Sequence, residues 1–269
     1  MDFDAETHVL ATEPGHFVAD VDPSWSVVRG PNGGYVAAIV LRAMAETVDD
    51  SGRAPRSFTV HYVSPAVEGA VQISTSVERS GRSMTSCSAR MIQEDRLIAM
   101  AVGAFSSARP GPSLDDLRMP TVDPPEALPL RSMTEDAPPI ARRWESVHAV
   151  GGLPFWESAG ADEALSGGWL RLPERHIPDA FVVAAATDAW VPAIFSRVNE
   201  PIVVPTVDLT IHFRGSLPYP NASADDYLFV QFRTTVIADG FLEEDGEVWS
   251  RDGVLLAQSR QLAAVFPMA

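Results

Sequence analysis

Asp188 is the only carboxylate in the apolar stretch "FVVAAATDAWVPAIF", residues 181–195. A carboxylate inside a buried helix loses its hydration, which is unfavourable unless hydrogen-bond partners replace the water. Pro192 follows four residues later and cannot donate to the carbonyl oxygen of Asp188, so we expect a helix kink there. An ionised but poorly hydrated carboxylate can act as a general base. The alternative is a buried Asp with a structural hydrogen-bonding role.

A second stretch, "RGPNGGYVAAIVLRAM" at residues 29–44, places a Pro-Asn-Gly-Gly turn directly before another apolar helix. The first N–H groups of a helix have no partner within the helix and point at whatever lies next to the turn. Asn32 can cap this terminus, and Gly33 and Gly34 allow backbone or a ligand to approach closely. Both a ligand site and a plain capped turn fit this pattern.

The elements that would position these residues fall into two halves. Residues 106–140 carry eight of the 22 prolines and little apolar periodicity. Because proline has no N–H to donate to a helix or sheet, this segment is interpreted as an extended connector. We therefore predict an N-terminal repeat over residues 1–108, a proline-rich linker over 109–141, and a C-terminal repeat over 142–269.

Each half contains one helix candidate followed by strand candidates. The predicted helices span residues 34–49 and 179–195. The predicted strands span residues 57–66, 69–79, 84–93 and 95–107 in the first half, and 205–216, 227–238 and 247–266 in the second, the last being two strands around Asp252-Gly253. "TVHYVSP" at 59–65 aligns with "TIHFRGS" at 210–216, and "LIAM" at 97–100 with "LLAQ" at 255–258. The pattern predicts a tandem α+β repeat.

Both helix candidates are apolar at nearly every position, so each is expected to be buried on all sides, as inside a sheet that curls around it. The formal charge of −16 argues against a nucleic-acid-binding protein, which needs a basic surface. One cysteine, Cys87, allows no intrachain disulfide and is interpreted as a core residue. No signal peptide, membrane-span-length apolar stretch, G-x-S-x-G or H-E-x-x-H motif is present. We expect a cytoplasmic protein without a membrane span.

The segments "PNGGYVAAIVLRAM", "SFTVHYVSPA", "QEDRLIAMAVGAF", "TDAWVPAIF", "PTVDLTIHF" and "DGVLLAQSRQLAAV" resemble the two halves of the acyl-CoA thioesterase II-like family. The resemblance covers nearly the whole chain except the connector and the first dozen residues. It implies an α+β double hotdog fold, in which two tandem repeats each wrap an antiparallel sheet round a central helix. It also implies hydrolysis of fatty acyl-CoA thioesters with no metal and no organic cofactor.

The resemblance implies three catalytic residues around a water molecule. They are an aspartate at Asp188, a hydroxyl at Thr206 and a glutamine at Gln261. Asp188 would act as general base, with direct attack on the thioester as the alternative. The backbone N–H groups of Gly34 and Tyr35 would stabilise the negative charge on the thioester oxygen.

Two features of this assignment need a structural answer. In an ideal strand Thr206 would face away from the apolar side that covers the helix, so it must precede the regular strand or a bulge must re-aim it. Gln258 and Gln261 would face opposite ways, and the family pattern favours Gln261. In the first repeat the aligned positions hold Pro55 and Gly103, which predicts one working site per chain.

Other expectations concern partners and rival functions. Arg29, Arg42, Arg79 and Arg82 are candidates for binding the anionic CoA, and outer sheet faces could pair in a homo-oligomer. The equivalent His61 and His212 are expected to be structural. A non-catalytic acyl-CoA-binding protein and a hotdog enoyl-CoA hydratase remain alternatives, although no D-x-N-P-x-H stretch is present for the latter.

Overall fold

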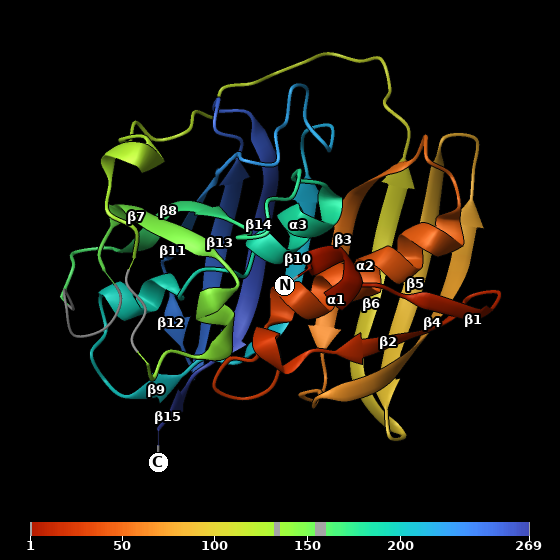
Figure 1. The fold of residues 1–269 in the computed structure, drawn as a ribbon, viewed down its shortest axis with the longest axis horizontal. Helices are drawn as coiled ribbons and strands as arrows, with labels where there is room; N and C mark the ends of the chain where they lie inside the picture. Colours follow the sequence, from red (N-terminus) through yellow and green to blue (C-terminus); the bar gives the residue numbers. More distant parts are fainter. Residues whose placement is uncertain (1, 132–134, 154–159, 269) are drawn as a thin grey trace.

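A computed structural model describes residues 2–131, 135–153 and 160–268 of the chain. Within these residues one 13-stranded antiparallel sheet runs in the order β1-β2-β4-β5-β6-β3-β10-β14-β13-β11-β8-β7, with β12 paired to β13. The two longest described helices, α2 and α3, lie on the same side of this sheet and pack against each other (Figure 1). The expected α+β double hotdog is confirmed by this arrangement.

The two halves of the sheet repeat the same order. The first half contains β1 (Leu10–Glu13), β2 (His16–Val21), β3 (Ala54–Tyr62), β4 (Gly69–Ser80), β5 (Met84–Gln93) and β6 (Arg96–Ser106). The second contains β7 (Glu145–Gly151), β8 (Ala164–Arg171), β10 (Thr206–Phe213), β11 (Leu228–Thr234), β12 (Ile237–Ala238), β13 (Phe241–Trp249) and β14 (Leu255–Ala264). A small separate sheet joins β9 (Ile202–Val203) to β15 (Phe266–Pro267). The tandem repeat is therefore present in the structure.

The repeats meet where β3 pairs antiparallel with β10. Thr59 and Thr210, which occupy equivalent positions in the two repeats, are directly paired in this register. Their hydroxyl oxygens are 3.0 Å apart and hydrogen-bonded. A residue that pairs with its own counterpart marks a pseudo-two-fold axis, as in an isologous dimer interface. The chain thus contains within one polypeptide the contact that two copies of a single repeat would make.

Helix α2 spans Gly33–Val48 and fills the concave side of the first half of the sheet. Its residues from Gly34 to Leu41 are all buried, as the apolar sequence predicts. Asn32 is the N-cap, and its Oδ1 accepts a hydrogen bond from Tyr35 N–H at 3.1 Å. The predicted cap is therefore confirmed, and the helix begins one residue earlier than expected.

Helix α3 is shorter than predicted. It spans only Ala180–Ala186, and a 3-10 helix, η5 (Ala193–Ser196), follows after an irregular turn. The expectation of one kinked helix to residue 195, with Asp188 inside it, is wrong. Pro192 cannot donate to the Asp188 carbonyl oxygen, which prevents a regular helix through this turn, but α3 already ends six residues before Pro192. That oxygen instead accepts from the Asn32 side-chain amide of the other repeat at 2.7 Å.

Four strands of the large sheet were not expected from the sequence. β1, β2, β7 and β8 extend this sheet at its two outer ends. β8 carries Gly167 and Gly168, which weaken the strand pattern because a strand interior rarely holds glycine. β13 begins at Phe241, six residues before the predicted strand, whereas the expected turn at Asp252-Gly253 does separate β13 from β14.

The connector between β6 and β7 crosses one end of the sheet (Figure 1). Its residues 107–124 form neither helix nor strand, as its proline content predicts. Two short 3-10 helices follow, η2 (Pro125–Ala127) and η3 (Pro139–Arg142). Within the described part of the chain, no helix has the length and apolar character that crossing a membrane would require.

Candidate active site

Asp188 lies in the turn after α3, against the N-terminus of α2. Its Oδ2 accepts hydrogen bonds from the Asn32 side-chain amide at 2.9 Å and from Gly34 N–H at 3.0 Å. The positive end of the helix dipole favours a negative charge at this place. The two repeats therefore supply the acid and its donors separately. Hydrogen bonds between the described residues leave the other oxygen, Oδ1, without a partner.

Two glycines make this approach possible. A Cβ atom at Gly33 would lie 2.9 Å from Asp188 Oδ2, and one at Gly34 would lie 2.5 Å from the Ala185 carbonyl oxygen. Either distance is too short for a side chain. Tyr62, at the end of β3, donates from its hydroxyl to the Gly33 carbonyl oxygen at 2.7 Å and fixes the turn from the sheet side. The turn that opens α2 is thus shaped to receive Asp188.

The surroundings of Asp188 raise its pKa. Burial raises the pKa of the carboxyl from 3.8 to about 6, while hydrogen bonds from Gly34, Gly33 and Asn32 partly counter the shift. The residue as a whole, backbone included, is intermediate in exposure. Burial and the neighbouring charge of Asp188 also raise the pKa of Tyr62 well above its ordinary value. Asp188 is therefore mostly ionised near neutral pH and poorly hydrated, two properties that suit a general base.

The two backbone amides predicted to stabilise the thioester oxygen both have acceptors within the protein. Gly34 N–H donates to Asp188, and Tyr35 N–H donates to Asn32. Gly33 and Gly34 thus allow Asp188 and the backbone of α3, and not a ligand, to lie close to the start of α2. A thioester oxygen would have to displace one of these acceptors, so the structure gives the predicted oxyanion role no support.

Thr206 begins β10, and the register of β10 against β14 is irregular between Thr206 and Asp208. Thr206 pairs with Ala263, and Asp208 already pairs with the next residue back, Leu262. In an unbroken register Val207 would pair with Ala263. Thr206 takes that position, so its side chain lies on the same face of the sheet as Leu209. The irregularity resolves the predicted conflict, because it turns the hydroxyl toward the inner face.

Gln261 lies on the inner face of β14 and is 5% exposed. Its Oε1 accepts from the Thr206 hydroxyl at 2.8 Å, so the structure brings these two predicted residues together. Gln258 lies on the opposite face, where its Oε1 accepts from Arg214 at 2.9 Å. Only Gln261 enters the interior, as the alternation of the strand predicts.

Glu244 on β13 belongs to the same cluster and was missed from the sequence. It is 3% exposed. Its Oε1 accepts from the Gln261 amide at 2.8 Å, and its Oε2 accepts from the Ala193 N–H at 2.6 Å. The signal was present in the alternation of "FLEEDGEVW", which places Glu244 on the inward face with Leu242 and Val248. The predicted strand began at residue 247 and therefore did not include Glu244.

Burial raises the pKa of Glu244 from 4.5 to about 7. Hydrogen bonds from Ala193 and Gln261 lower it, whereas the negative charges of Asp188 and Glu243 raise it further. The negative charge of Asp188 thus lies near enough to help raise the pKa of Glu244. No hydrogen bond in the described chain joins Asp188 to Thr206 or Gln261 directly.

The equivalent region of the first repeat lacks these groups. Gly103 stands in the alignment position of Gln261, and a Cβ atom there would lie 2.9 Å from the Met44 side chain of α2. The other aligned position, Pro55, pairs with Phe105 on β6. Apolar packing therefore occupies the place where the second repeat has its polar cluster.

Several other predicted residues lie away from this cluster. Arg29, Arg79 and Arg82 are exposed, and Arg42 is ion-paired with Asp4. His61 and His212 are both exposed, on β3 and β10. Cys87 is a buried core residue, as expected, and burial raises the pKa of its thiol to about 11.

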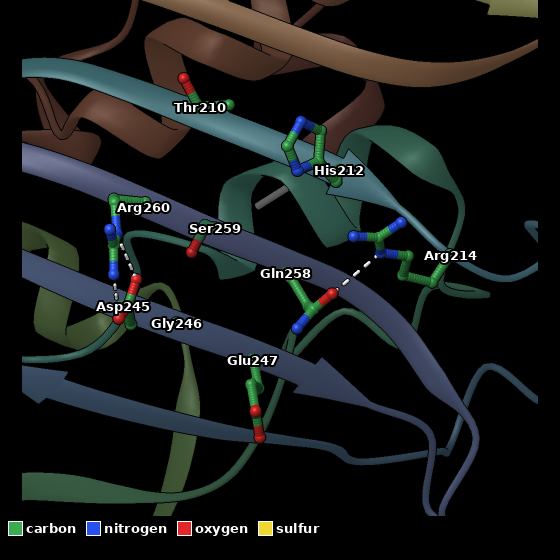
Figure 2. A pocket seen from close by; sticks show the side chains of 9 residues that line it. All are labelled: Thr210, His212, Arg214, Asp245, Gly246, Glu247, Gln258, Ser259 and Arg260. Carbon is green, nitrogen blue, oxygen red and sulfur yellow. Dashed lines mark hydrogen bonds and ion pairs between the residues drawn. The ribbon is translucent and has the colours of Figure 1, made fainter. Parts of the chain in front are cut away.

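An open groove of about 340 Å³ lies on the outer face of β10, β13 and β14. Figure 2 shows its polar lining, in which Arg260 is paired with Asp245 and Arg214 with Gln258. Gln258 faces this groove while Gln261 faces the interior. The groove is therefore separated from Asp188 by the sheet, and we do not place the chemistry there.

One group in the described chain has ligand atoms close enough to hold a metal ion, namely Asp4, His176 and Asp179. Its members already have other partners. Asp4 is paired with Arg42 and with His176, and Asp179 caps the first turn of α3. The positive guanidinium beside Asp4 makes this group a poor cation site.

Comparisons with known proteins agree with this architecture. The family model of the acyl-CoA thioesterase N-terminal domain matches residues 21–106, and that of the acyl-CoA thioesterase C-terminal domain matches residues 120–265. A conserved protein of unknown function with a hot dog fold from Alicyclobacillus acidocaldarius is 26% identical, with a TM-score of 0.90 over 99% of this chain and 98% of that one.

Two mycobacterial structures are more distant in sequence. The tesB protein of Mycobacterium avium subspecies paratuberculosis is 19% identical, with a TM-score of 0.80 over 99% of this chain and 98% of that one. An acyl-CoA thioesterase II from Mycobacterium marinum is 18% identical, with a TM-score of 0.77 over 100% of this chain and 99% of that one. At such identities these likenesses bear on the fold alone. No curated protein matches the chain.

Proposed function

The chain belongs to the acyl-CoA thioesterase family, and on this basis we propose that it hydrolyses fatty acyl-CoA to fatty acid and CoA by attack of water, with Asp188 as general base. A thioester hydrolase needs a group that takes a proton from water near neutral pH. A carboxylate whose pKa is about 6 meets this need better than an ordinary aspartate, because it is a stronger base and is still mostly ionised.

The single observation that carries the proposal is the environment of the Asp188 carboxylate. Oδ2 is fixed by donors from the start of α2, while Oδ1 has no partner among the described residues. A water that donates to Oδ1 would be oriented by a carboxylate that cannot rotate away. Pre-organisation of this kind lowers the entropic part of the barrier.

In the proposed reaction the oxygen of that water attacks the thioester carbon as Asp188 takes its proton. The tetrahedral intermediate then collapses, the carbon–sulfur bond breaks, and the CoA thiolate receives the proton from Asp188. Thr206 supports the attack by accepting the second hydrogen bond of the water. Its own O–H is already donated to Gln261, which leaves its lone pairs free.

The test is Asp188→Asn, which keeps the size of the side chain and removes its basicity. We expect kcat for thiol release from a panel of acyl-CoA substrates to fall by about 10²–10⁴-fold, the usual contribution of a general base, with little change in KM. Asp252→Asn, at the exposed turn between β13 and β14, is the matched control and should retain full activity. Full activity of Asp188→Asn would refute the proposal.

Product analysis separates the rival functions. Binding of acyl-CoA without thiol release by the unaltered protein would favour a non-catalytic acyl-CoA-binding role. Addition of water to enoyl-CoA would favour a hydratase. A single turnover in ¹⁸O-labelled water distinguishes base catalysis from direct attack by Asp188. Base catalysis puts the label into the fatty acid at once, whereas a mixed anhydride that is hydrolysed at the aspartyl carbon yields unlabelled acid first.

A further inference from the structure

Glu244, Gln261 and Thr206 form a hydrogen-bonded row that runs from the middle of β13 through β14 to the start of β10. The row begins at Ala193 N–H of η5, which donates to Glu244 Oε2. Gln261 then donates its amide to Glu244 Oε1 and accepts the Thr206 hydroxyl on its own Oε1. The carboxylate therefore lies two hydrogen bonds behind the threonine.

The chemistry of the groups fixes the direction of the row. A backbone N–H can only donate, so Glu244 Oε2 must accept from Ala193. An ionised carboxylate offers only acceptors, so Gln261 must present its NH₂ group to Glu244 and its carbonyl oxygen to Thr206. Thr206 is then obliged to donate its O–H to Gln261. Toward the interior, the Thr206 hydroxyl can then only accept hydrogen bonds through its lone pairs.

We propose that Glu244 is a positioning residue, which through Gln261 holds Thr206 as a hydrogen-bond acceptor for the attacking water. This inference rests on the proposed hydrolysis of acyl-CoA and extends it to a carboxylate that touches neither substrate nor water. It also gives Gln261 a defined role. Its oxygen accepts from Thr206 and its nitrogen donates to Glu244, so it transmits the orientation of the carboxylate to the hydroxyl.

Protonation of Glu244 reverses the row. The proton must go to Oε1, because Oε2 faces the Ala193 N–H. The acid then donates to Gln261, whose amide turns over and donates to Thr206. The Thr206 O–H is thereby released from Gln261 and presents a donor to the water, where the original row presents only lone pairs. The charges that act on Glu244 are those of Asp188 in the turn after α3 and of Glu243 beside it on β13. Together with burial they place its pKa near 7, so the reversal falls in an accessible pH range.

The first test is Glu244→Gln. The new amide must give its oxygen to the fixed Ala193 N–H and its NH₂ to Gln261, which produces the reversed row at every pH. We expect kcat to fall by about 10- to 100-fold with KM unchanged, less than the loss of the base itself. In the unaltered protein we expect kcat to fall with acid through two protonations, near pH 7 and near pH 6. Glu244→Gln should retain only the one near 6.

The second test exchanges the two side chains in Glu244→Gln/Gln261→Glu. The amide now on β13 again accepts from Ala193 N–H and donates to the carboxylate now on β14. That carboxylate also accepts from the Thr206 hydroxyl, so the original direction returns. Measured at about pH 9, where the carboxyl groups of the site are ionised, this variant should recover most of the kcat lost in the single variant. Glu247→Gln, which removes a partly buried glutamate on the outer face of the same strand, is the matched control and should behave as the unaltered protein.

The outcomes separate this inference from the function on which it rests. If the unaltered protein releases no thiol from acyl-CoA, the proposed function fails. If it is active and Glu244→Gln has the same kcat and pH profile, only the role of Glu244 is refuted. A folded exchange variant that is no more active than Glu244→Gln would also refute it. Should Glu244→Gln fail to fold, the absence of a protonation near pH 7 in the unaltered protein would decide against the inference.

Discussion

Asn32 connects the acid of the second repeat to the helix of the first. Its Oδ1 caps α2 through Tyr35 N–H, and its Nδ2 donates both to the carbonyl oxygen and to the carboxylate of Asp188. One small side chain thus stabilises a helix and lowers the pKa of an acid that burial has raised. These two effects can be separated by substitution, because capping uses the oxygen and Asp188 uses the nitrogen.

We predict that Asn32→Ser and Asn32→Ala both weaken the support of Asp188 but differ in stability. Removing a donor from the charged form raises the pKa of Asp188 above about 6, so the acid limb of kcat moves to higher pH in both variants. Ser can still cap α2, whereas Ala cannot and should cost about 1 kcal/mol. Denaturant unfolding and pH–rate profiles measure the two effects. If the acid limb of the kcat–pH profile did not move in either variant, the role of Asn32 in lowering the pKa of Asp188 would be contradicted.

The residues of the site differ in how far the sequence could reveal them. Asp188 stands out as a charge in an apolar stretch, and the Asn32 cap follows from the turn chemistry. That Asn32 reaches Asp188 could not be predicted, because the contact joins two repeats whose relative placement no local pattern encodes. Glu244 was missed for a different reason, since its strand begins earlier than the clear alternation does.

At the scale of elements, the site depends on how closely the N-terminus of α2 approaches the end of α3. Gly34 stands at this contact, with the Ala185 carbonyl oxygen where its Cβ would be. The early end of α3 is equally necessary, because it places Asp188 in a turn that faces α2. Pro192 indicated a helix defect at this point, but the sequence did not show that the helix would stop.

Gly34→Ala should separate the two helices and disturb the acid. The added methyl would lie 2.5 Å from a backbone oxygen, so the helix ends must shift apart. We expect a loss of about 1–3 kcal/mol in the free energy of unfolding, typical of overpacking, together with a lower kcat as the Gly34–Asp188 hydrogen bond lengthens. Gly111→Ala, at a connector position with no atom within 4 Å, is the control. Equal stability of the two variants would show that the contact tolerates a methyl group.

At the scale of the whole molecule, two buried acids make stability depend on pH. The pKa values of Asp188 and Glu244 are raised from 3.8 to about 6 and from 4.5 to about 7. Between the unfolded and folded values the native state binds more protons than the unfolded chain. These two groups therefore lower the free energy of unfolding as pH rises from about 4 to about 7.

Glu244→Gln removes the contribution of Glu244 to the pH dependence of the free energy of unfolding. Glutamine does not titrate, so the variant should gain stability relative to the unaltered protein as pH rises from about 5 to about 8. The gain should be on the order of 3 kcal/mol, which corresponds to a shift from 4.5 to about 7. Urea unfolding at the two pH values measures it. A difference that is independent of pH would show that Glu244 titrates normally.

The overall architecture was more predictable than the sheet's full extent. Two buried helices, each followed by alternating strands, required a repeated α+β unit whose sheet surrounds a helix. The strands that extend the sheet, β1 and β7, are short or glycine-flanked and lie at its ends, where pairing on one side only leaves a weak pattern. Tertiary pairing, and not local preference, decides such strands.

The contact of Asp188 with Asn32 and Gly34 makes the two repeats of the chain depend on each other. In a protein with two equivalent repeats, one repeat could in principle be redundant, and substitutions in it would then leave the function intact. Here the first copy lacks the acid, yet it supplies Asn32 and Gly34 to a carboxylate that lies at least 154 residues further along the chain. Neither repeat is redundant for this contact, because one supplies the carboxylate and the other supplies its hydrogen-bond donors.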